Sequence, residues 1–136
     1  MVKLFLRIAI AVGFLSAVAD RLGYWPKESS TWGTWDSFLE YTQSMIPFLP
    51  SSITSVLGLA ATILEIVFAL ALLVGYKTEL FAKLSGFLLI LFGLAMTFSF
   101  GIKPPLDYSV FAAAAAAFAL STIKEKRFEL DTALNK

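Results

Sequence analysis

The sequence predicts an all-α fold: an integral membrane four-helix bundle of up-down-up-down topology, with an amphipathic interfacial helix in the first outer loop. Of the 136 residues, 58% are hydrophobic and 13 are Phe, a composition too apolar for a soluble domain of this size. Four stretches qualify as crossings, for which ~20 mostly apolar residues are needed. Residues 1–136 are expected to form a single transmembrane bundle domain, with no second domain.

The first two predicted crossings have clear boundaries. The first covers about 4–22, and Asp20 and Arg21 replace the small residues of a signal-peptide cleavage site, so the helix is expected to be permanent. The second covers about 53–75 and follows a proline and two serines, which favour a helix start with a serine cap. Gly75 is expected to close it in a left-handed conformation.

The last two crossings are separated by a short proline-containing turn. The third covers about 80–101 and ends before "KPP", because proline cannot continue a helix interior. The fourth covers about 108–123, with Asp107 as its expected cap. Its sequence "FAAAAAAFAL" makes a smooth cylinder that a neighbouring helix can approach closely.

The connection between the first and second crossings is long and holds all three tryptophans. Within it, apolar side chains recur at helical spacing and predict an amphipathic helix over about 34–46, capped by Thr34. Such a helix either anchors in the headgroup layer or folds as a lid across the outer mouth of the bundle. The side chains expected at this interface or lid are Trp25, Trp32, Trp35 and Phe38.

The basic residues indicate an orientation in the membrane. Eight fall on the side of the termini and three on the opposite side, which favours a multi-pass protein of the cell (inner) membrane with both termini cytoplasmic. The cytoplasmic set is Lys3, Arg7, Lys77, Lys83, Lys124, Lys126, Arg127 and Lys136, and the outer set is Arg21, Lys27 and Lys103.

Glu65 is the central candidate for a functional site, because it is a single carboxylate within the apolar run "LAATILEIVFALALLVG". An acidic residue at a helix centre costs ~2.5 to 3.5 kcal/mol on insertion, so we expect it to face the bundle interior and meet a partner from the first helix. One arrangement is an ion pair with Arg7 that locks the two helices. The other is a pair with Asp20 that shares a proton, with Arg21 nearby, as in a proton relay or a polar ligand site.

The composition excludes several kinds of chemistry. The chain has no Cys and no His, which rules out disulfides, thiol chemistry, thiolate metal sites and imidazole catalysis. There is no glycine-rich phosphate loop or metal-ligand cluster, so no metal and no intrinsic cofactor are expected, and whether the chain is an enzyme stays open. A net charge of +1 gives no electrostatic footprint for nucleic acid.

The segments "LRIAIAVGFLSAVADRLG" and "ILEIVFALALLVGYKTELFAKLSGFLLILFGLAMT" resemble the DoxX-like membrane proteins. That family has an arginine early in helix one, a glutamate in helix two and a glycine-led turn into helix three, positions that Arg7, Glu65 and Gly75 occupy here. The resemblance implies a four-helix membrane bundle. Relatives include DoxD, a subunit of a thiosulfate:quinone oxidoreductase; MauE, a maturation factor of methylamine dehydrogenase; and NACHO, an assembly chaperone of acetylcholine receptors.

Two functions are therefore expected from different classes. The first is a non-enzymatic accessory or assembly (chaperone-type) subunit with a buried polar site around Glu65. The second is a membrane subunit of an oxidoreductase complex that binds a quinone or a lipid between its helices. The expected partners are membrane lipids and another membrane or exported protein, with a homo-oligomer left open and no nucleic acid. A transporter is not favoured, because no inverted repeat or broken helix is evident.

Overall fold

The computed structural model describes residues 1–135, and every regular element in that part of the chain is a helix. The predicted all-α class is therefore confirmed. Three helices are long and apolar enough to cross a membrane, as expected for a membrane protein. They are α1 (Val2–Arg21), α3 (Ser51–Val74) and α4 (Thr78–Phe100). The shorter helices are α2 (Trp35–Met45), α5 (Lys103–Asp107), α6 (Val110–Thr122) and α7 (Leu130–Leu134). Lys136, one of the basic residues used to predict the orientation, lies outside the described residues.

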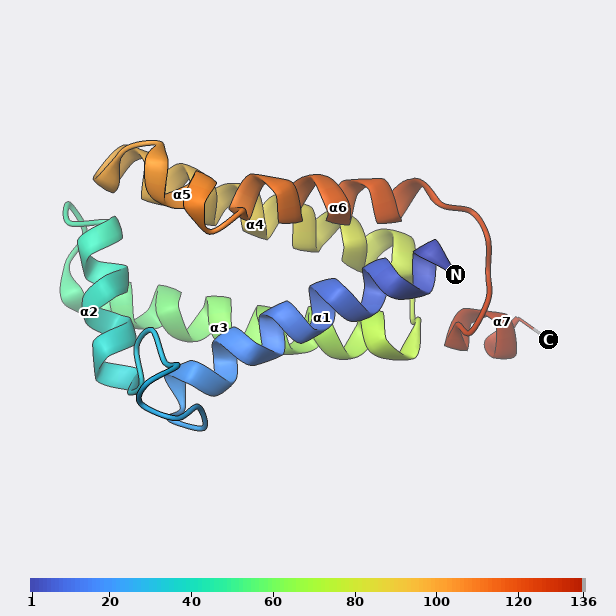
Figure 1. Cartoon of the computed structure of the whole chain (residues 1–136), viewed down its shortest axis with the longest axis horizontal. Coiled ribbons are helices and arrows are strands. Elements are labelled where there is room, and N and C mark those ends of the chain that lie inside the picture. Colours follow the sequence, from blue (N-terminus) through green and yellow to red (C-terminus); the bar gives the residue numbers. More distant parts are fainter. Residues whose placement is uncertain (136) are drawn as a thin grey trace.

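The helices form two pairs that run side by side (Figure 1). Helix α1 lies along α3 and α4 lies along α6, while α3 packs against α4 and α1 against α6. Helix α2 crosses the far end of the molecule from the two termini, where it contacts α1, α3 and α4. The buried cluster between the pairs includes Phe14, Phe68, Leu72, Leu88 and Leu120.

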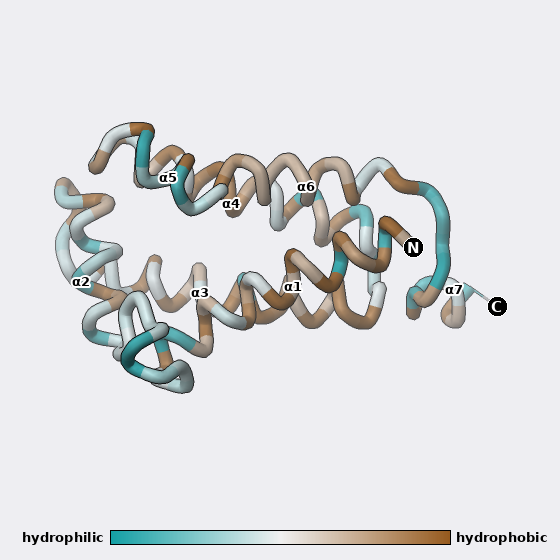
Figure 2. The backbone as a smooth tube through the Cα atoms, in the orientation of Figure 1, coloured by the Kyte–Doolittle hydropathy of each residue, from teal (hydrophilic) through white to brown (hydrophobic). Residues whose placement is uncertain are grey.

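The outer faces of the long helices are apolar (Figure 2), and large side chains such as Phe5, Val56, Leu91 and Phe98 are exposed on them. Soluble proteins rarely leave a continuous apolar surface of this kind in contact with water. In a bilayer the same surface contacts lipid chains, so the exposed apolar faces agree with membrane insertion of these helices.

Two of the expected helix caps are confirmed and two are wrong. Gly75 closes α3 with φ 74°, and the Thr34 hydroxyl accepts a hydrogen bond from the Ser37 amide at the start of α2. Helix α3 has Pro50 as its N-cap, without a side-chain cap. Asp107 does not cap α6, because it ends the separate helix α5 and pairs with Lys103 at 2.5 Å within it.

The fourth crossing, predicted over 108–123, is shorter than expected. Helix α6 has 13 residues, which gives ~20 Å of rise and falls below the ~30 Å of a bilayer core. It packs closely on α4: a Cβ atom added at Gly86 would lie 2.8 Å from the Phe118 ring, and one at Gly93 would lie 2.7 Å from the Phe111 ring. The two glycines therefore allow the phenyl rings of α6 to reach the backbone of α4.

After α6 the chain returns across the end of the molecule that carries the N-terminus and the α3–α4 turn, which we call the turn end (Figure 1). This C-terminal segment, residues 123–135, includes α7 and was not predicted. The Asp131 amide donates to the Gly75 carbonyl at 3.2 Å, and the Lys77 amide donates to the Asp131 carboxylate at 2.9 Å. A Cβ atom at Gly75 would lie 2.6 Å from the Glu129 Cα, so glycine is required there by contact as well as by φ.

Candidate functional site

Glu65 faces the interior and forms a buried ion pair with Arg21. Their side chains are 2% and 4% exposed. The two guanidinium Nη atoms donate to the two carboxylate oxygens, Nη2 to Oε1 at 3.1 Å and Nη1 to Oε2. Arg21 Nη1 also donates to the Thr62 hydroxyl at 2.8 Å. The contact joins the last residue of α1 to the middle of α3, in the two-point geometry that gives arginine–carboxylate pairs their strength.

The partner of Glu65 is therefore not one of the two that the sequence suggested. Asp20 is turned away from it and binds the loop between α1 and α2, residues 22–34, which we call the outer loop after its predicted position. Its carboxylate accepts hydrogen bonds from the amides of Thr31 at 2.7 Å and of Trp32 and Gly33 at 2.9 Å. Three backbone donors satisfy this carboxylate without a shared proton. The predicted proton-sharing pair of Glu65 and Asp20 is accordingly wrong.

Arg7 lies at the turn end, 14 residues before Arg21 on α1 and therefore ~21 Å from it along the helix axis. Its Nε donates to the Leu72 carbonyl at 2.7 Å and its Nη2 to the Leu73 carbonyl at 2.8 Å. Its Nη1 donates to the Phe128 carbonyl at 2.8 Å. Arg7 thus satisfies carbonyl groups at the C-terminal end of α3, for which the helix itself supplies no donor, and the predicted Arg7–Glu65 pair is wrong.

Aromatic side chains of α2 and of the loop between α1 and α2 cover the Arg21–Glu65 pair. The Arg21 guanidinium carbon lies 4.0 Å from the centroid of the Phe38 ring and 5.2 Å from that of Trp32. Trp32 in turn packs edge-on against Phe38 at 5.4 Å, and Trp35 packs against Phe38 at 5.2 Å. These rings exclude water and add a cation–π attraction to the ion pair.

The aromatic side chains cover the ion pair because α1 ends beside it and leaves the next part of α3 without α1 as a neighbour. Helix α1 ends opposite Thr62, roughly 11 residues or ~16 Å short of the start of α3. Helix α2 occupies the space beyond the end of α1, with the Phe38 and Leu39 side chains against Gly58 of α3. On the side of α2 that faces α4, burial raises the pKa of Tyr41 above its usual value.

The predicted interface tryptophans do not act as one group. Trp32 and Trp35 pack around Phe38, as described above. Trp25 is 45% exposed and donates from its indole nitrogen to the Ser16 carbonyl of α1 at 3.1 Å. Trp25 therefore lies on the outside of the molecule, whereas the rings of Trp32 and Phe38 lie beside the Arg21 guanidinium.

Two buried hydrogen-bond donors at this site have no partner. Within residues 1–135, Arg21 Nε and Trp32 Nε1 are shielded from solvent and make no hydrogen bond. Buried donors are nearly always satisfied by protein or by ordered water. A hydrogen-bond acceptor placed beside either donor would therefore be stabilised.

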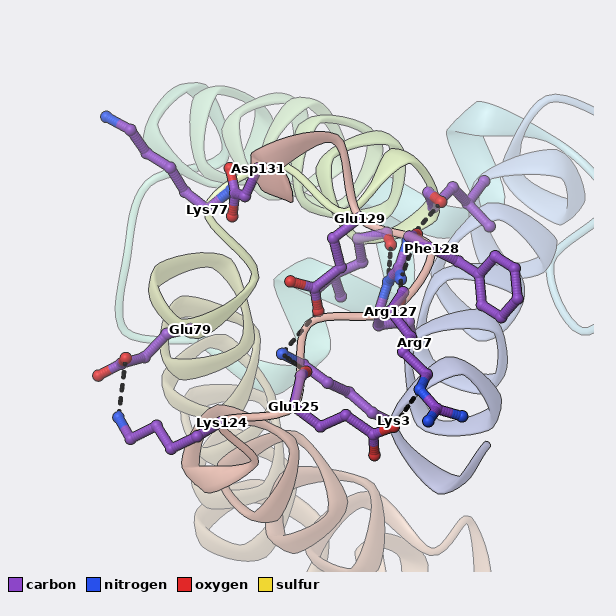
Figure 3. Close-up of polar contacts among 12 residues, drawn as sticks. Lys3, Arg7, Lys77, Glu79, Lys124, Glu125, Arg127, Phe128, Glu129 and Asp131 are labelled. Atoms are coloured by element: carbon purple, nitrogen blue, oxygen red, sulfur yellow. Dashed lines mark hydrogen bonds and ion pairs between the residues drawn. The ribbon is translucent and has the colours of Figure 1, made fainter. Parts of the chain in front are cut away.

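A second polar group lies at the turn end (Figure 3) and joins the C-terminal segment to α1. Lys3 Nζ donates to the Glu125 carbonyl at 2.7 Å and lies 2.6 Å from the Glu129 carboxylate. Lys3 and Arg7 are four residues apart, so they share one face of α1. Together the two cations hold the backbone of the C-terminal segment at several points.

Sequence reasoning missed Thr62, Lys3 and Glu129. Thr62 stands three residues before Glu65, a spacing that places both on one helix face, so this residue could have been found. Lys3 and Glu129 are separated by nearly the whole chain, and no local pattern indicates that the C-terminal segment returns to α1. Within residues 1–135 no group of His, Cys, Asp or Glu is arranged to hold a metal ion.

Comparisons of the chain with protein-family models, with curated proteins and with solved structures found no match.

Proposed function

We propose that the chain is a multi-pass protein of the cell (inner) membrane that acts as a non-enzymatic accessory or assembly subunit, with a DoxX-like bundle fold. The observation that carries this proposal is the contact of Glu65 with Arg21. Both oxygens of the only carboxylate within the apolar part of α3 accept from one guanidinium, and the Thr62 hydroxyl accepts from it as well. A carboxylate bound in this way joins helices and is poorly suited to carry a proton.

Two other buried charged side chains of α1 also serve the fold. Asp20 holds the outer loop, and Arg7 holds the C-terminal segment. A chain that uses its buried charges for internal contacts offers mainly its outer surface to other molecules. That surface is apolar along α1, α3 and α4, so the partners proposed are membrane lipids and another membrane or exported protein, with a second copy of the chain as a further option.

In this proposal α6, extended by α5 and by flanking residues, forms the fourth member of an up-down-up-down bundle. The N-terminus and α7 lie at the turn end (Figure 1) together with Lys3, Lys77 and Lys124. The positive-inside rule favours the cytoplasm for this end. Helix α2 then lies at the outer face, as an interfacial helix that also closes the end of the bundle.

Isolation of the protein in mild detergent, followed by mass spectrometry of everything that co-purifies, tests the function. An accessory subunit is expected to retain a membrane or exported protein in a fixed ratio. The accessory role would be contradicted if, even after cross-linking in cells, no other protein co-purified and one quinone were recovered per chain.

The orientation has its own test. The chain contains no cysteine, so single cysteines can be introduced without removing others. Lys126→Cys is expected to react with an impermeant maleimide only after the membrane is opened, whereas Lys27→Cys should react in intact cells. The reverse pattern would contradict cytoplasmic termini.

The second candidate function is a quinone- or lipid-binding subunit of an oxidoreductase complex. It is favoured by the two unpartnered donors, Arg21 Nε and Trp32 Nε1, because a quinone or ester carbonyl would accept from them. Quinone extraction from the purified protein tests this. Binding that is lost in Trp32→Phe and kept in Trp25→Phe would support the second function over the first.

A further inference from the structure

We propose that the turn end contains a binding site for a phosphate group, located where α4 begins. The group is carried either by an anionic lipid headgroup or by a soluble phosphate compound. The proposal does not depend on the accessory role, because it concerns the opposite end of α1 from the Arg21–Glu65 pair.

The site is a cavity of about 420 Å³ between the start of α4, the end of α6 and the C-terminal segment. Its volume falls within the ~300 to 1,000 Å³ typical of small-molecule pockets. Figure 3 shows Glu79 and Lys124 on one side, and Lys3 with Glu129 on another. The cavity is open to solvent and is lined by four separate parts of the chain, from α1 to the C-terminal segment.

The backbone supplies one set of donors. Helix α4 has 23 residues, and its N-cap, Lys77, makes no side-chain cap hydrogen bond. The first three amides of the helix belong to Thr78, Glu79 and Leu80, and all three residues line the cavity. Amides in the first turn have no acceptor within a helix, and the helix dipole makes this position favourable for a phosphate.

A buried hydroxyl supplies an independent indication. Thr78 is 2% exposed and lines the cavity, and its Oγ1 makes no hydrogen bond within residues 1–135. Most buried hydroxyls in proteins have a partner. A phosphate oxygen at the α4 N-terminus would accept from this hydroxyl and from the amides beside it.

The charge of the lining suits an anion. Five lysines and three carboxylates surround the cavity. Glu79 is 2.8 Å from Lys83 and 3.2 Å from Lys124, and Lys3 pairs with Glu129. The third carboxylate, that of Asp131, accepts from a backbone amide. Among residues 1–135 the ammonium group of Lys126 forms no ion pair, so it is the surplus cation that an anion would neutralise. The Lys77 ammonium also forms no ion pair, but it lies 5.5 Å from the centroid of the Tyr76 ring.

The location favours a lipid as the source of the phosphate. The N-terminus of α1, the C-terminus of α3 and the N-terminus of α4 all meet here, so the cavity lies where three membrane-compatible helices end. This is the level of the headgroups when the helices are inserted. Lysines at the cytoplasmic surface are attracted to anionic lipids.

The test uses the full-length protein in mild detergent. Native mass spectrometry measures the retention of phosphatidylglycerol against phosphatidylcholine, and calorimetry measures the binding of inorganic phosphate. Preferential retention of phosphatidylglycerol that inorganic phosphate does not displace assigns the site to a lipid headgroup. Binding of inorganic phosphate that displaces the lipid assigns it to a soluble phosphate compound.

Thr78→Val is the decisive variant, because it removes a hydroxyl without a partner and keeps the branched side chain. Its unfolding transition should equal that of the wild type or lie slightly higher, while phosphate or lipid affinity falls about tenfold. Lys126→Gln should weaken binding about fivefold. The exposed Lys103→Gln, at the other end of the molecule, is the charge-matched control and should bind like the wild type. Equal binding by wild type and Thr78→Val, or no binding of either probe, overturns the proposal.

Discussion

Arg21, the last residue of α1, holds the Glu65 carboxylate at the middle of α3 with both of its Nη atoms. The pair is almost fully buried and is covered by Phe38. Removing one member of such a pair leaves an uncompensated buried charge, which costs ~3 to 5 kcal/mol. The contact therefore contributes to the packing of α1 on α3, in addition to the apolar cluster that includes Phe14 and Phe68.

Arg21→Lys is expected to lower the free energy of unfolding by ~1 to 2 kcal/mol, because lysine keeps the charge and loses the two-point contact and the flat stacking on Phe38. Unfolding by SDS in mixed micelles measures the loss. Arg127→Lys, at an exposed position, serves as the control, and its free energy of unfolding should equal that of the wild type. Equal stability of the two variants would show that a positive charge at position 21 is sufficient to hold Glu65, without the two-point contact.

Asp20→Asn is expected to loosen the outer loop. The amide has one acceptor oxygen in place of two, so it cannot accept from the amides of Thr31, Trp32 and Gly33 together. Hydrogen bonds to a charged group contribute ~1.5 to 3 kcal/mol each. Tryptophan fluorescence should shift to the red as Trp32 gains solvent, and the exposed Asp36→Asn should leave the spectrum unchanged. An unshifted spectrum in Asp20→Asn would contradict this role.

Arg7→Met is expected to release the C-terminal segment, because the variant loses every hydrogen bond from Arg7 to the carbonyls of Leu72, Leu73 and Phe128. Hydrogen exchange at residues 125–135 should accelerate at least tenfold, as expected for the loss of more than ~1.4 kcal/mol of local stability. Exchange in the interior of α3 should change little. Protection of the segment at the wild-type level would show that Lys3 and Gly75 hold it without Arg7.

Gly93→Ala is expected to separate α4 from α6, because the new Cβ would lie 2.7 Å from the Phe111 ring. Overpacking of this kind costs ~1 to 3 kcal/mol. Gly13→Ala on α1 is the matched control, since no atom lies within 4 Å of the position that its new Cβ would take, and it should be neutral or stabilising by ~1 kcal/mol. Similar thermal stability of both variants would contradict a tight α4–α6 contact.

The long apolar helices and the inward position of Glu65 could be predicted from the sequence. Length and hydropathy define the helices, and the cost of a carboxylate in lipid requires that it face other helices. The start of α2 could be predicted as well, because a Thr34 cap followed by apolar side chains at helical spacing is a local pattern. Each of these features depends on residues close together in the chain.

The partner of Glu65 could not be chosen from the sequence. Asp20 and Arg21 are adjacent, so their side chains point ~100° apart around α1, and only one of them can face α3. The rotation of α1 about its own axis determines which of the two side chains faces α3, and that rotation follows from the packing of the whole molecule. The loop amides that bind Asp20 become available only after the outer loop has folded back.

The role of Arg7 was missed for a different reason. Its acceptors at Arg127 and Phe128 belong to a segment of mixed polarity that gives no helical or strand pattern. Only the structure shows that this segment returns to the turn end. Arg7 lies next to Gly75, since its Nη2 atom is 2.7 Å from the position of a Cβ added there, whereas Glu65 contacts Arg21.

A double-mutant cycle with Arg21→Met and Glu65→Leu tests most directly whether the ion pair is structural. Each single variant is expected to lose ~3 to 5 kcal/mol of unfolding free energy, and the double variant is expected to return to within ~1 kcal/mol of the wild type, because two apolar side chains replace two charges. Losses that simply add in the double variant would contradict a structural pair. So would a Glu65→Gln variant that keeps full stability and loses the function of the protein.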